Sequence, residues 1–268
     1  MARTVVSFHA HPDDEALLVA GTLARLAAEG HRVVLVCATD GGAGLAAGEL
    51  APSLASTRRA ELLRAASEIG CSEVRFLGYD DSGMDGRSGE AGFAAAPVEE
   101  AARRLADLLV DVGADALTVY DPAGGYGHPD HVQVHRVGVR AAELAGTPLV
   151  LEATVDRRLL LRALRTLAAL RLAPGDWRPE RFESAWADPA RLTHRVDVRR
   201  WAAQKRRAMA AHASQATADD GTRTLAAFLR FPMPLFRLVF GHEWFVERGR
   251  RPGGRLLDDP LAGLDHRE

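Results

Sequence analysis

The sequence predicts an α/β fold of the Rossmann-like type, in which a mostly parallel sheet carries helices on both faces. One observation leads to this prediction: through residues 1–155, short apolar runs alternate with longer, alanine-rich segments of helical character. Strands separated by helices in this way imply a parallel sheet that is buried on both sides.

Five apolar runs of strand length predict the sheet. The β-branched run Thr4–His9 and the run RVVLVCA at Arg32–Ala38 have the composition of buried strands. Further runs of the same kind recur at intervals that leave room for a helix between them. These strands are expected at Glu73–Leu77, Ala116–Tyr120 and Pro148–Val155.

Four helices are expected between these strands. The segment Ala16–Glu29 is closed by Gly30, and Ser53–Ile69 has Ser53 as its cap and Gly70 beyond its end. The other two helices are expected at Pro97–Val112 and His131–Leu144. For this arrangement we expect the strand order 3-2-1-4-5, which places strand 1 beside strand 4 and opens a crevice where the order reverses.

The rest of the chain has a different pattern. We expect residues 156–249 to pack on the core formed by residues 1–155 and to close the substrate pocket. Arg157–Leu172 has arginines along one side and leucines along another, so this amphipathic helix either docks on the sheet or contacts a membrane surface or a partner. Leu225–Phe245 is expected as a lid or packing segment, and residues 250–268 as a flexible tail.

The composition excludes several classes of protein. Hydrophobic residues make up 47% and charged residues 26% of the 268, which excludes general disorder. A net charge of -2, from 34 basic and 36 acidic residues, argues against nucleic-acid binding. No apolar run is long enough for a transmembrane segment. Two cysteines without CxxC spacing and no signal-peptide pattern predict a cytoplasmic location, and the sequence is compatible with a homo-oligomer.

The first chemical motif, HAHPDDE, follows the first strand. His11 and Asp14 lie three residues apart across a strand-to-helix turn, so both can face one point. An imidazole and a carboxylate are typical ligands of zinc. The alternative is a helix cap whose acidic residues stabilise the positive end of the helix.

The second motif, GYGHPDH, follows the fourth strand and repeats the order of strand, His-Pro-Asp and helix. On its own it is compatible with a glycine-rich turn that carries surface histidines. In the expected sheet, however, both motifs reach the same crevice, and His131 becomes a third ligand beside His11 and Asp14. Three ligands leave an open position for water, and Asp13 remains as a base that binds no metal.

Together the AHPDDE and GYGHPDH motifs resemble those of the PIG-L/LmbE-like N-acetylglucosaminyl deacetylases. The resemblance covers most of residues 4–155 and, more weakly, the part with Lys205, His212 and Gln215. The run Asp81-Ser82-Gly83-Met84 makes the sequence similar to the actinobacterial branch that serves mycothiol biosynthesis. The C-terminal third departs from the mycothiol pattern, which leaves the aglycone of the substrate open.

The resemblance implies a role for each matching residue. His11, Asp14 and His131 would bind Zn²⁺, although Fe²⁺ or another divalent metal suits the same ligands. Asp13 would be the general base. The remaining implied roles are an oxyanion or leaving-group contact for His128, a contact with the tetrahedral intermediate for Tyr126, orientation of His128 by Asp130, and sugar binding by Arg58 and Asp81.

The resulting hypothesis is a zinc-dependent hydrolase that removes an N-acyl group from a glucosamine-containing small molecule. Its alternatives within the same class are a mycothiol-conjugate amidase and a deacetylase that modifies the sugar of a secondary metabolite. A non-catalytic metal- or nucleotide-binding module is the alternative from another class. His212, outside the two motifs, either caps a helix or contacts substrate.

Overall fold

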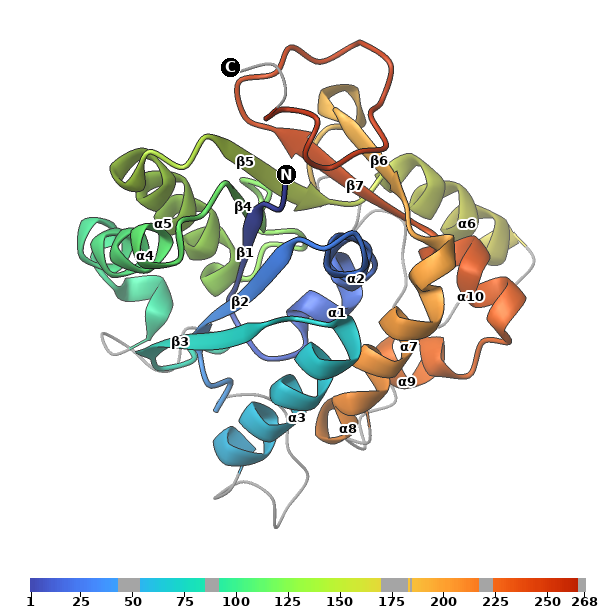
Figure 1. Ribbon diagram of the computed structural model, residues 1–268. Helices are drawn as coiled ribbons and strands as arrows, with labels where there is room; N and C mark the ends of the chain where they lie inside the picture. The colour runs from blue at the N-terminus through green and yellow to red at the C-terminus, as the bar shows by residue number, and fades with distance from the viewer. Residues whose placement is uncertain (43–53, 85–91, 170–182, 184, 217–223, 265–268) are drawn as a thin grey trace.

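The computed structural model describes residues 1–42, 54–84, 92–169, 183, 185–216 and 224–264. Within these ranges the strands form a seven-stranded mixed sheet of order β3-β2-β1-β4-β5-β7-β6 (Figure 1). The strands are β1 Thr4–His9, β2 Arg32–Thr39, β3 Glu73–Tyr79, β4 Ala116–Tyr120, β5 Leu149–Thr154, β6 His194–Asp197 and β7 His242–Glu247. The predicted parallel order 3-2-1-4-5 is confirmed, and two antiparallel strands extend it beyond β5.

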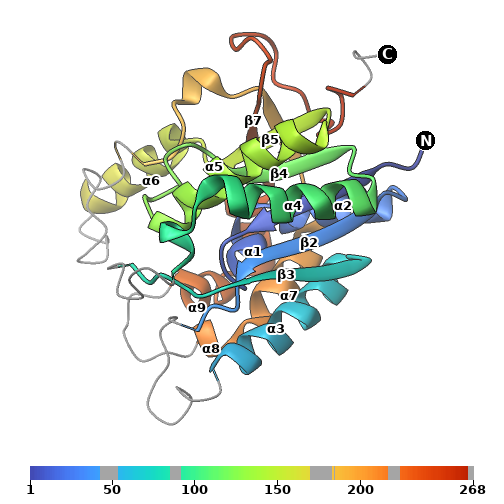
Figure 2. The same ribbon diagram turned by 90° about the vertical axis from the view of Figure 1, so that its left-hand side faces the viewer.

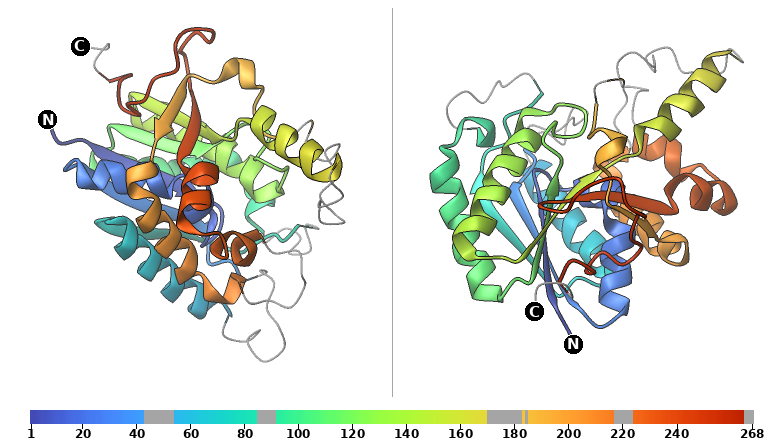
Figure 3. Two further views of the ribbon diagram at one scale, coloured as in Figure 1. Left: turned by 90° about the vertical axis from the view of Figure 1, so that its right-hand side faces the viewer. Right: turned by 90° about the horizontal axis from the view of Figure 1, so that it is seen from above.

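Helices cover both faces of this sheet. The helices are α1 Asp14–Leu18, α2 Ala20–Ala28, α3 Leu54–Ile69, α4 Val98–Val112, α5 Pro129–Ala145, α6 Arg157–Ala169, α7 Ala202–Ala211, α8 Ala213–Ala216, α9 Thr224–Leu229 and α10 Met233–Phe240. On one face α4 and α5 lie side by side (Figure 2). On the other face α7 packs against α2 and α3 (Figure 3). The expected cap Ser53 lies outside the described residues.

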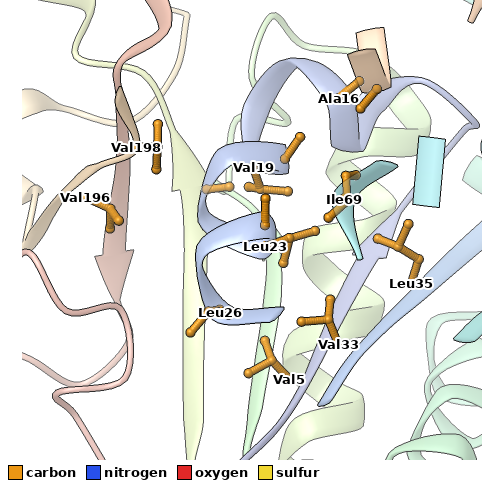
Figure 4. Close-up of a cluster of buried hydrophobic side chains, with 14 of the residues drawn as sticks. Val5, Ala16, Val19, Leu23, Leu26, Val33, Leu35, Ile69, Val196 and Val198 are labelled. Atoms are coloured by element: carbon orange, nitrogen blue, oxygen red, sulfur yellow. The ribbon is translucent and has the colours of Figure 1, made fainter. Parts of the chain in front are cut away.

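Two apolar clusters hold the layers together, one on each side of the sheet. The cluster between the sheet and α2 includes Val5, Leu23 and Leu35, all fully buried (Figure 4). The cluster on the α4–α5 side uses the alternate residues of the same strands, such as Val6 and Val34. The central strands are therefore apolar on both faces, which is why they appear in the sequence as continuous apolar runs.

The single helix expected at Ala16–Glu29 is interrupted at Val19, and the reason lies in the C-terminal part. The carboxylate of Glu243 on β7 accepts the backbone N–H groups of Gly21 (2.9 Å) and Thr22 (2.7 Å), which belong to the first turn of α2. A side chain on Gly21 would come within 2.7 Å of Val198. Lys205 donates to the same carboxylate at 2.6 Å and compensates its buried charge.

Two expectations for the C-terminal part need correction. The segment Leu225–Phe245 is not only a lid or packing segment, because its last residues begin β7 and join the sheet. The flexible tail expected from residue 250 does not describe the residues up to Leu264. Leu261 and Leu264 are buried, and Asp258 accepts the backbone N–H of Asp197 at 2.6 Å. Within the described ranges, no helix is long and apolar enough to cross a membrane.

His194 on β6 is fully buried, and it makes the stability of the fold sensitive to acid. Its Nδ1 lies 2.9 Å from Oγ1 of Thr193, whereas its Nε2 has no hydrogen-bond partner among the described residues. Burial lowers the pKa of His194 from 6.5 to about 4. The unfolded chain therefore takes up a proton near pH 6.5 that the folded protein does not accept until about pH 4.

We predict that His194→Gln reduces this sensitivity. Stability linked to His194 is complete above pH 6.5 and is lost as the pH falls toward 4. Between pH 7 and pH 5 the loss is about 2 kcal/mol. Urea unfolding of both proteins at the two pH values tests this, with the smaller decrease expected for the variant. An equal decrease in both proteins would show that His194 is not responsible.

Candidate active site

The two histidine motifs lie together at the carboxyl ends of β1 and β4, which are neighbours in the sheet. His11 follows β1, whereas His128 and His131 stand at the start of α5, after β4. The ring centroid of His11 lies 4.8 Å from that of His128 and 5.6 Å from that of His131. The strand-order reversal thus brings two distant parts of the sequence to one place, as the sequence predicts.

His11, Asp14 and His131 form a group that could hold a divalent metal. Oδ2 of Asp14 lies 3.4 Å from Nδ1 of His11, and Oδ1 lies 3.3 Å from Nε2 of His131. Ligand atoms on a tetrahedral ion with bonds of about 2.0–2.1 Å stand about 3.4 Å apart. Nε2 of His131 is buried and finds no hydrogen-bond partner among the described residues. A cation would satisfy this nitrogen, so the group fits a metal of zinc type.

The charge around His11 also favours a cation. Nε2 of His11 lies 3.0 Å from Asp130 and 3.3 Å from Asp81, in addition to the contact of Nδ1 with Asp14. Burial acts to lower the pKa of His11, but hydrogen bonds with these three carboxylates outweigh it and raise the pKa well above 6.5. Burial acts to raise the pKa of Asp14, but His131 and His11 outweigh it and hold this pKa well below 3.8. The site therefore carries an excess of negative charge that a metal ion can neutralise.

His11, His128 and Asp130 are a second possible ligand group. Two contacts make this group less suitable. Nδ1 of His128 already accepts the backbone N–H of Asp130 at 3.1 Å, and Oδ2 of Asp130 already accepts the backbone N–H of Ser82 at 3.0 Å. The sequence predicts that the Asp130 carboxylate orients His128, but this carboxylate instead contacts His11. The contact that Asp130 makes with the His128 ring comes from its backbone N–H, because His128 is the N-cap of α5.

The contact of His128 with the helix start defines its tautomer. Burial, with the charges of His11 and His131, lowers the pKa of His128 to about 4, so the ring is neutral at neutral pH. Since Nδ1 accepts a hydrogen bond, the proton of the neutral ring lies on Nε2. His128 can therefore donate to an oxygen atom of substrate. The Tyr126 ring lies 6.2 Å from His128 and is 53% exposed, at the solvent side of the histidines.

Asp13 stands beside the metal group with its side chain 22% exposed. Its Oδ1 accepts from the guanidinium of Arg58 at 3.1 Å. Burial raises the pKa of Asp13, and the charge of Arg58 opposes this rise. Asp13 also has φ 117°, a backbone conformation that is unfavourable for residues other than glycine. Asp13 is therefore a carboxylate of raised basicity in a strained position next to the open side of the site.

Arg58 and Asp81, the residues expected to bind the sugar, lie in the same site but are already engaged. Arg58 is 3% exposed and donates to the backbone carbonyls of Gly41 (2.7 Å) and Pro12 (2.6 Å). Asp81 lies against His11, which contributes to lowering its pKa to about 2, although burial acts in the opposite direction. Both residues therefore hold the turn after β1 in place, through Pro12 and His11 respectively.

Asp121, to which the sequence analysis gave no role, anchors the loop of the second motif. Its Oδ1 accepts from the backbone N–H groups of Ala123 (3.0 Å) and Gly125 (3.1 Å). Its Oδ2 accepts from the Thr154 hydroxyl (2.6 Å) and from the backbone N–H of Ala187 (2.9 Å). The loop with Tyr126 and His128 is therefore tied to β5 and to the C-terminal part. The Asp-Pro-Ala-Gly turn was the available signal, since Asp at this position commonly accepts from the residue two further on.

Glu15 and His212 were also missed as a pair. Both are fully buried, with Oε1 of Glu15 2.7 Å from Nε2 of His212. His212 is the C-cap residue of α7, so the expected helix cap is confirmed, and its fully buried side chain additionally pairs with Glu15. No local pattern reports this pairing, because the two residues come from opposite ends of the sequence.

Comparison with known proteins identifies the family to which this chain belongs. A model described as "PIG-L: GlcNAc-PI de-N-acetylase" matches residues 6–142. The chain belongs to the PIG-L family. It is 38% identical to a 1D-myo-inositol 2-acetamido-2-deoxy-alpha-D-glucopyranoside deacetylase of Streptomyces avermitilis, covering 96% of each chain. A protein of the same name from Thermobifida fusca is 39% identical over 82% of this chain and 86% of its own length. The chain is thus an N-deacetylase, and the non-catalytic alternative is excluded.

Solved structures confirm the fold of the family. The N,N'-diacetylchitobiose deacetylase of Pyrococcus horikoshii superposes with a TM-score of 0.63 at 23% identity, covering 92% of this chain and 84% of that one. The 4-carboxy-2-hydroxymuconate hydratase GalB of Pseudomonas putida gives 0.59 at 18% identity, covering 95% and 100%. A deacetylase and a hydratase share this fold, so the fold alone does not define the reaction.

We predict which of the two ligand groups binds the metal. Asp14→Asn and His131→Gln should each weaken Zn²⁺ binding by at least about 10–100-fold, since even the loss of residues around a ligand costs this much. His128→Gln is the matched control and should retain near-stoichiometric metal. Calorimetric titration of metal-free protein with ZnCl₂ measures these affinities. Loss of binding in His128→Gln with retention in His131→Gln would assign the metal to the other group.

Proposed function

We propose that this chain is a zinc-dependent deacetylase of a small glucoside whose sugar is 2-acetamido-2-deoxy-glucose, with 1D-myo-inositol as the aglycone. The observation that carries the proposal is the match to the Streptomyces avermitilis relative, which extends over 96% of both chains and therefore includes the C-terminal part. The arrangement of His11, Asp14 and His131 supports the metal requirement of such a reaction.

In this proposal His11, Asp14 and His131 hold the zinc ion. Zinc, when bound there, supplies Lewis-acid activation of water and of the amide carbonyl. Asp13 accepts a proton from the attacking water, for which its partly exposed carboxylate and its raised pKa are suited. Asp130 fixes His11 through the contact of its Oδ2 with Nε2 at 3.0 Å.

His128 and Tyr126 act on the substrate side of this group. The Nε2–H of His128 donates to the amide oxygen as negative charge develops on it, and a donor of this kind contributes roughly 2.7–4 kcal/mol in other hydrolases. When the C–N bond breaks, the departing amine takes the proton that Asp13 gained from the attacking water, and His128 keeps its Nε2 proton as a hydrogen-bond donor. The Tyr126 hydroxyl, at the exposed edge of the site, contacts the tetrahedral carbon's oxygen.

Arg58 and Asp81 provide the sugar contacts in the same proposal. A guanidinium and a carboxylate are complementary to sugar hydroxyls. Nε of Arg58 is buried without a hydrogen-bond partner among the described residues, so the protein contacts there leave one donor of the guanidinium unused. Asp81 has its Oδ1 occupied by the N–H of Gly83 at 2.9 Å.

We predict that Asp13→Asn separates catalysis from metal binding. The amide keeps the shape of the side chain but cannot accept a proton, so kcat should fall roughly 10²–10⁴-fold while zinc remains bound. Acetate release from 1D-myo-inositol 2-acetamido-2-deoxy-α-D-glucopyranoside measures the rate, and elemental analysis measures the metal. Prolonged chelation should abolish the activity of the parent enzyme, and added Zn²⁺ should restore it. Full activity in metal-free protein, or in Asp13→Asn, would contradict the proposal.

The choice of substrate is tested by competition among acyl compounds. If an amide conjugate of a thiol is hydrolysed with a higher kcat/KM than the inositol glucoside, the chain is a conjugate amidase. If an acylated sugar with a larger aglycone is hydrolysed with the higher kcat/KM, the chain is a deacetylase that modifies the sugar of a secondary metabolite.

For the sugar contacts we predict a different kinetic signature. Asp81→Asn should raise KM for the glucoside about 10-fold or more, because a hydrogen bond to a charged group contributes roughly 1.5–3 kcal/mol. Its kcat should change less than its KM. Steady-state kinetics on the glucoside and on free N-acetylglucosamine provide the comparison. A fall in kcat with an unchanged KM would instead assign Asp81 to the support of His11.

A further inference from the structure

The peptide unit between Pro12 and Asp13 is held at both of its ends. Its carbonyl oxygen accepts from the Arg58 guanidinium at 2.6 Å. Its N–H donates to Oε2 of Glu15 at 3.1 Å. These two contacts fix the plane of the peptide and, with it, the φ of 117° at Asp13. A residue other than glycine in such a conformation costs of order 1–3 kcal/mol, so surrounding contacts must maintain it.

Glu15 is itself fixed by a residue from the far end of the chain. Its other oxygen, Oε1, lies 2.7 Å from Nε2 of His212, and both side chains are fully buried. With Oε1 held by His212, Oε2 of Glu15 is directed at the Asp13 N–H, from which it accepts at 3.1 Å.

A separate contact attaches the segment that carries His212. Ser214 donates to Glu61 on α3 through its backbone N–H (2.8 Å) and its hydroxyl (2.7 Å). Glu61 is 2% exposed, so it resembles Glu15 in burial and in charge. It differs in one respect that matters for an experiment: no hydrogen bond or ion pair joins Glu61 to Asp13 in the described part of the chain. Glu61 thus anchors the same segment without reaching the site.

We propose that Glu15 and His212 are positioning residues for the reaction, which act by fixing the backbone of Asp13 and hence the direction of its carboxylate. The inference rests on the proposed role of Asp13 as the base. Neither residue contacts the substrate, since both are fully buried. Loss of the pair leaves the Asp13 N–H without its acceptor and allows the peptide to rotate toward a more favourable φ. The carboxylate then turns away from the attacking water.

The expected effect is on kcat rather than on KM. Misplacement of a catalytic group by about 1 Å can cost about 10²-fold in rate. We therefore expect Glu15→Leu, which removes the acceptor but keeps an apolar volume in a buried position, to lower kcat about 10–100-fold. KM should stay within about 2-fold, and bound zinc should be retained, because Asp14 keeps its own contact with the His11 backbone N–H at 2.9 Å.

A double-mutant cycle with Asp13 tests the inference. If Glu15 acts only through Asp13, Glu15→Leu should have little further effect, within about 2-fold in kcat, once Asp13 is Asn. The residual rate of the Asp13→Asn proteins is measured by acetate release over long incubations. An equal loss of kcat in both backgrounds would overturn the inference, because it would mean that Glu15 acts on the fold or on the metal.

Glu61→Leu is the matched control for attachment of the segment. It should lower the melting temperature but leave kcat within about 2-fold of the parent. If Glu61→Leu reproduces the kcat loss of Glu15→Leu, docking of the segment is responsible and the inference is wrong. Should Glu15→Leu fail to fold, His212→Leu enters the same cycle, since it frees Glu15 from its other partner. If Asp13→Asn alone retains full kcat, the proposed function fails. This result differs from an equal loss of kcat on Glu15→Leu in both backgrounds, which overturns the inference alone.

Discussion

Three carboxylates around one buried imidazole are the constraint on which the site depends. Asp14, Asp81 and Asp130 all lie within 3.4 Å of His11. Each carboxylate is itself fixed by a backbone N–H group, from His11, Gly83 and Ser82 respectively. Such a concentration of negative charge is unfavourable in a buried place unless a cation compensates it. Three segments, the turns after β1 and β3 and the start of α5, therefore supply ligands to one positively charged centre.

The C-terminal part of the chain supports this centre through buried contacts with the loops that carry it. It reaches the first motif through His212, whose Nε2 lies 2.7 Å from Oε1 of Glu15, and it reaches the loop of the second motif through the Ala187 N–H, which donates to Asp121. These contacts place buried polar groups of the last hundred residues against the turns that carry the chemistry. Residues far from the reacting atoms can for this reason influence the rate without touching the substrate.

Much of the fold and of the site could be predicted from the sequence. Strand order, helix positions and the meeting of His11 with His131 follow from local apolar patterns and from the rule that parallel strands share one functional end. The antiparallel strands could not be predicted in the same way. β7 directly follows an apolar helix, so the run Leu225–Phe245 shows neither a helical nor a strand periodicity along its whole length. β6 has only four residues, which is too short for a clear pattern.

The details that could not be predicted within the site are matters of side-chain direction. Asp130 could contact either histidine, and a choice of rotamer at the start of α5 directs it to His11 rather than to His128. The sequence also cannot show that Arg58 would be buried, since its partners are backbone carbonyls of two separate turns. Glu15 and His212 form a pair only after the whole sheet has formed.

The two outer strands have a consequence for the behaviour of the protein at high concentration. An unpaired strand edge is a template on which a second chain can add its own strand. On β3 this edge carries the ion-paired Glu73 and Arg75, and its end is bridged by Gly92. On β6 it is short, and Leu257 bridges it on the outside. Both ends of the sheet are thus poor sites for strand addition, so growth of the sheet from one molecule into the next is disfavoured at either edge.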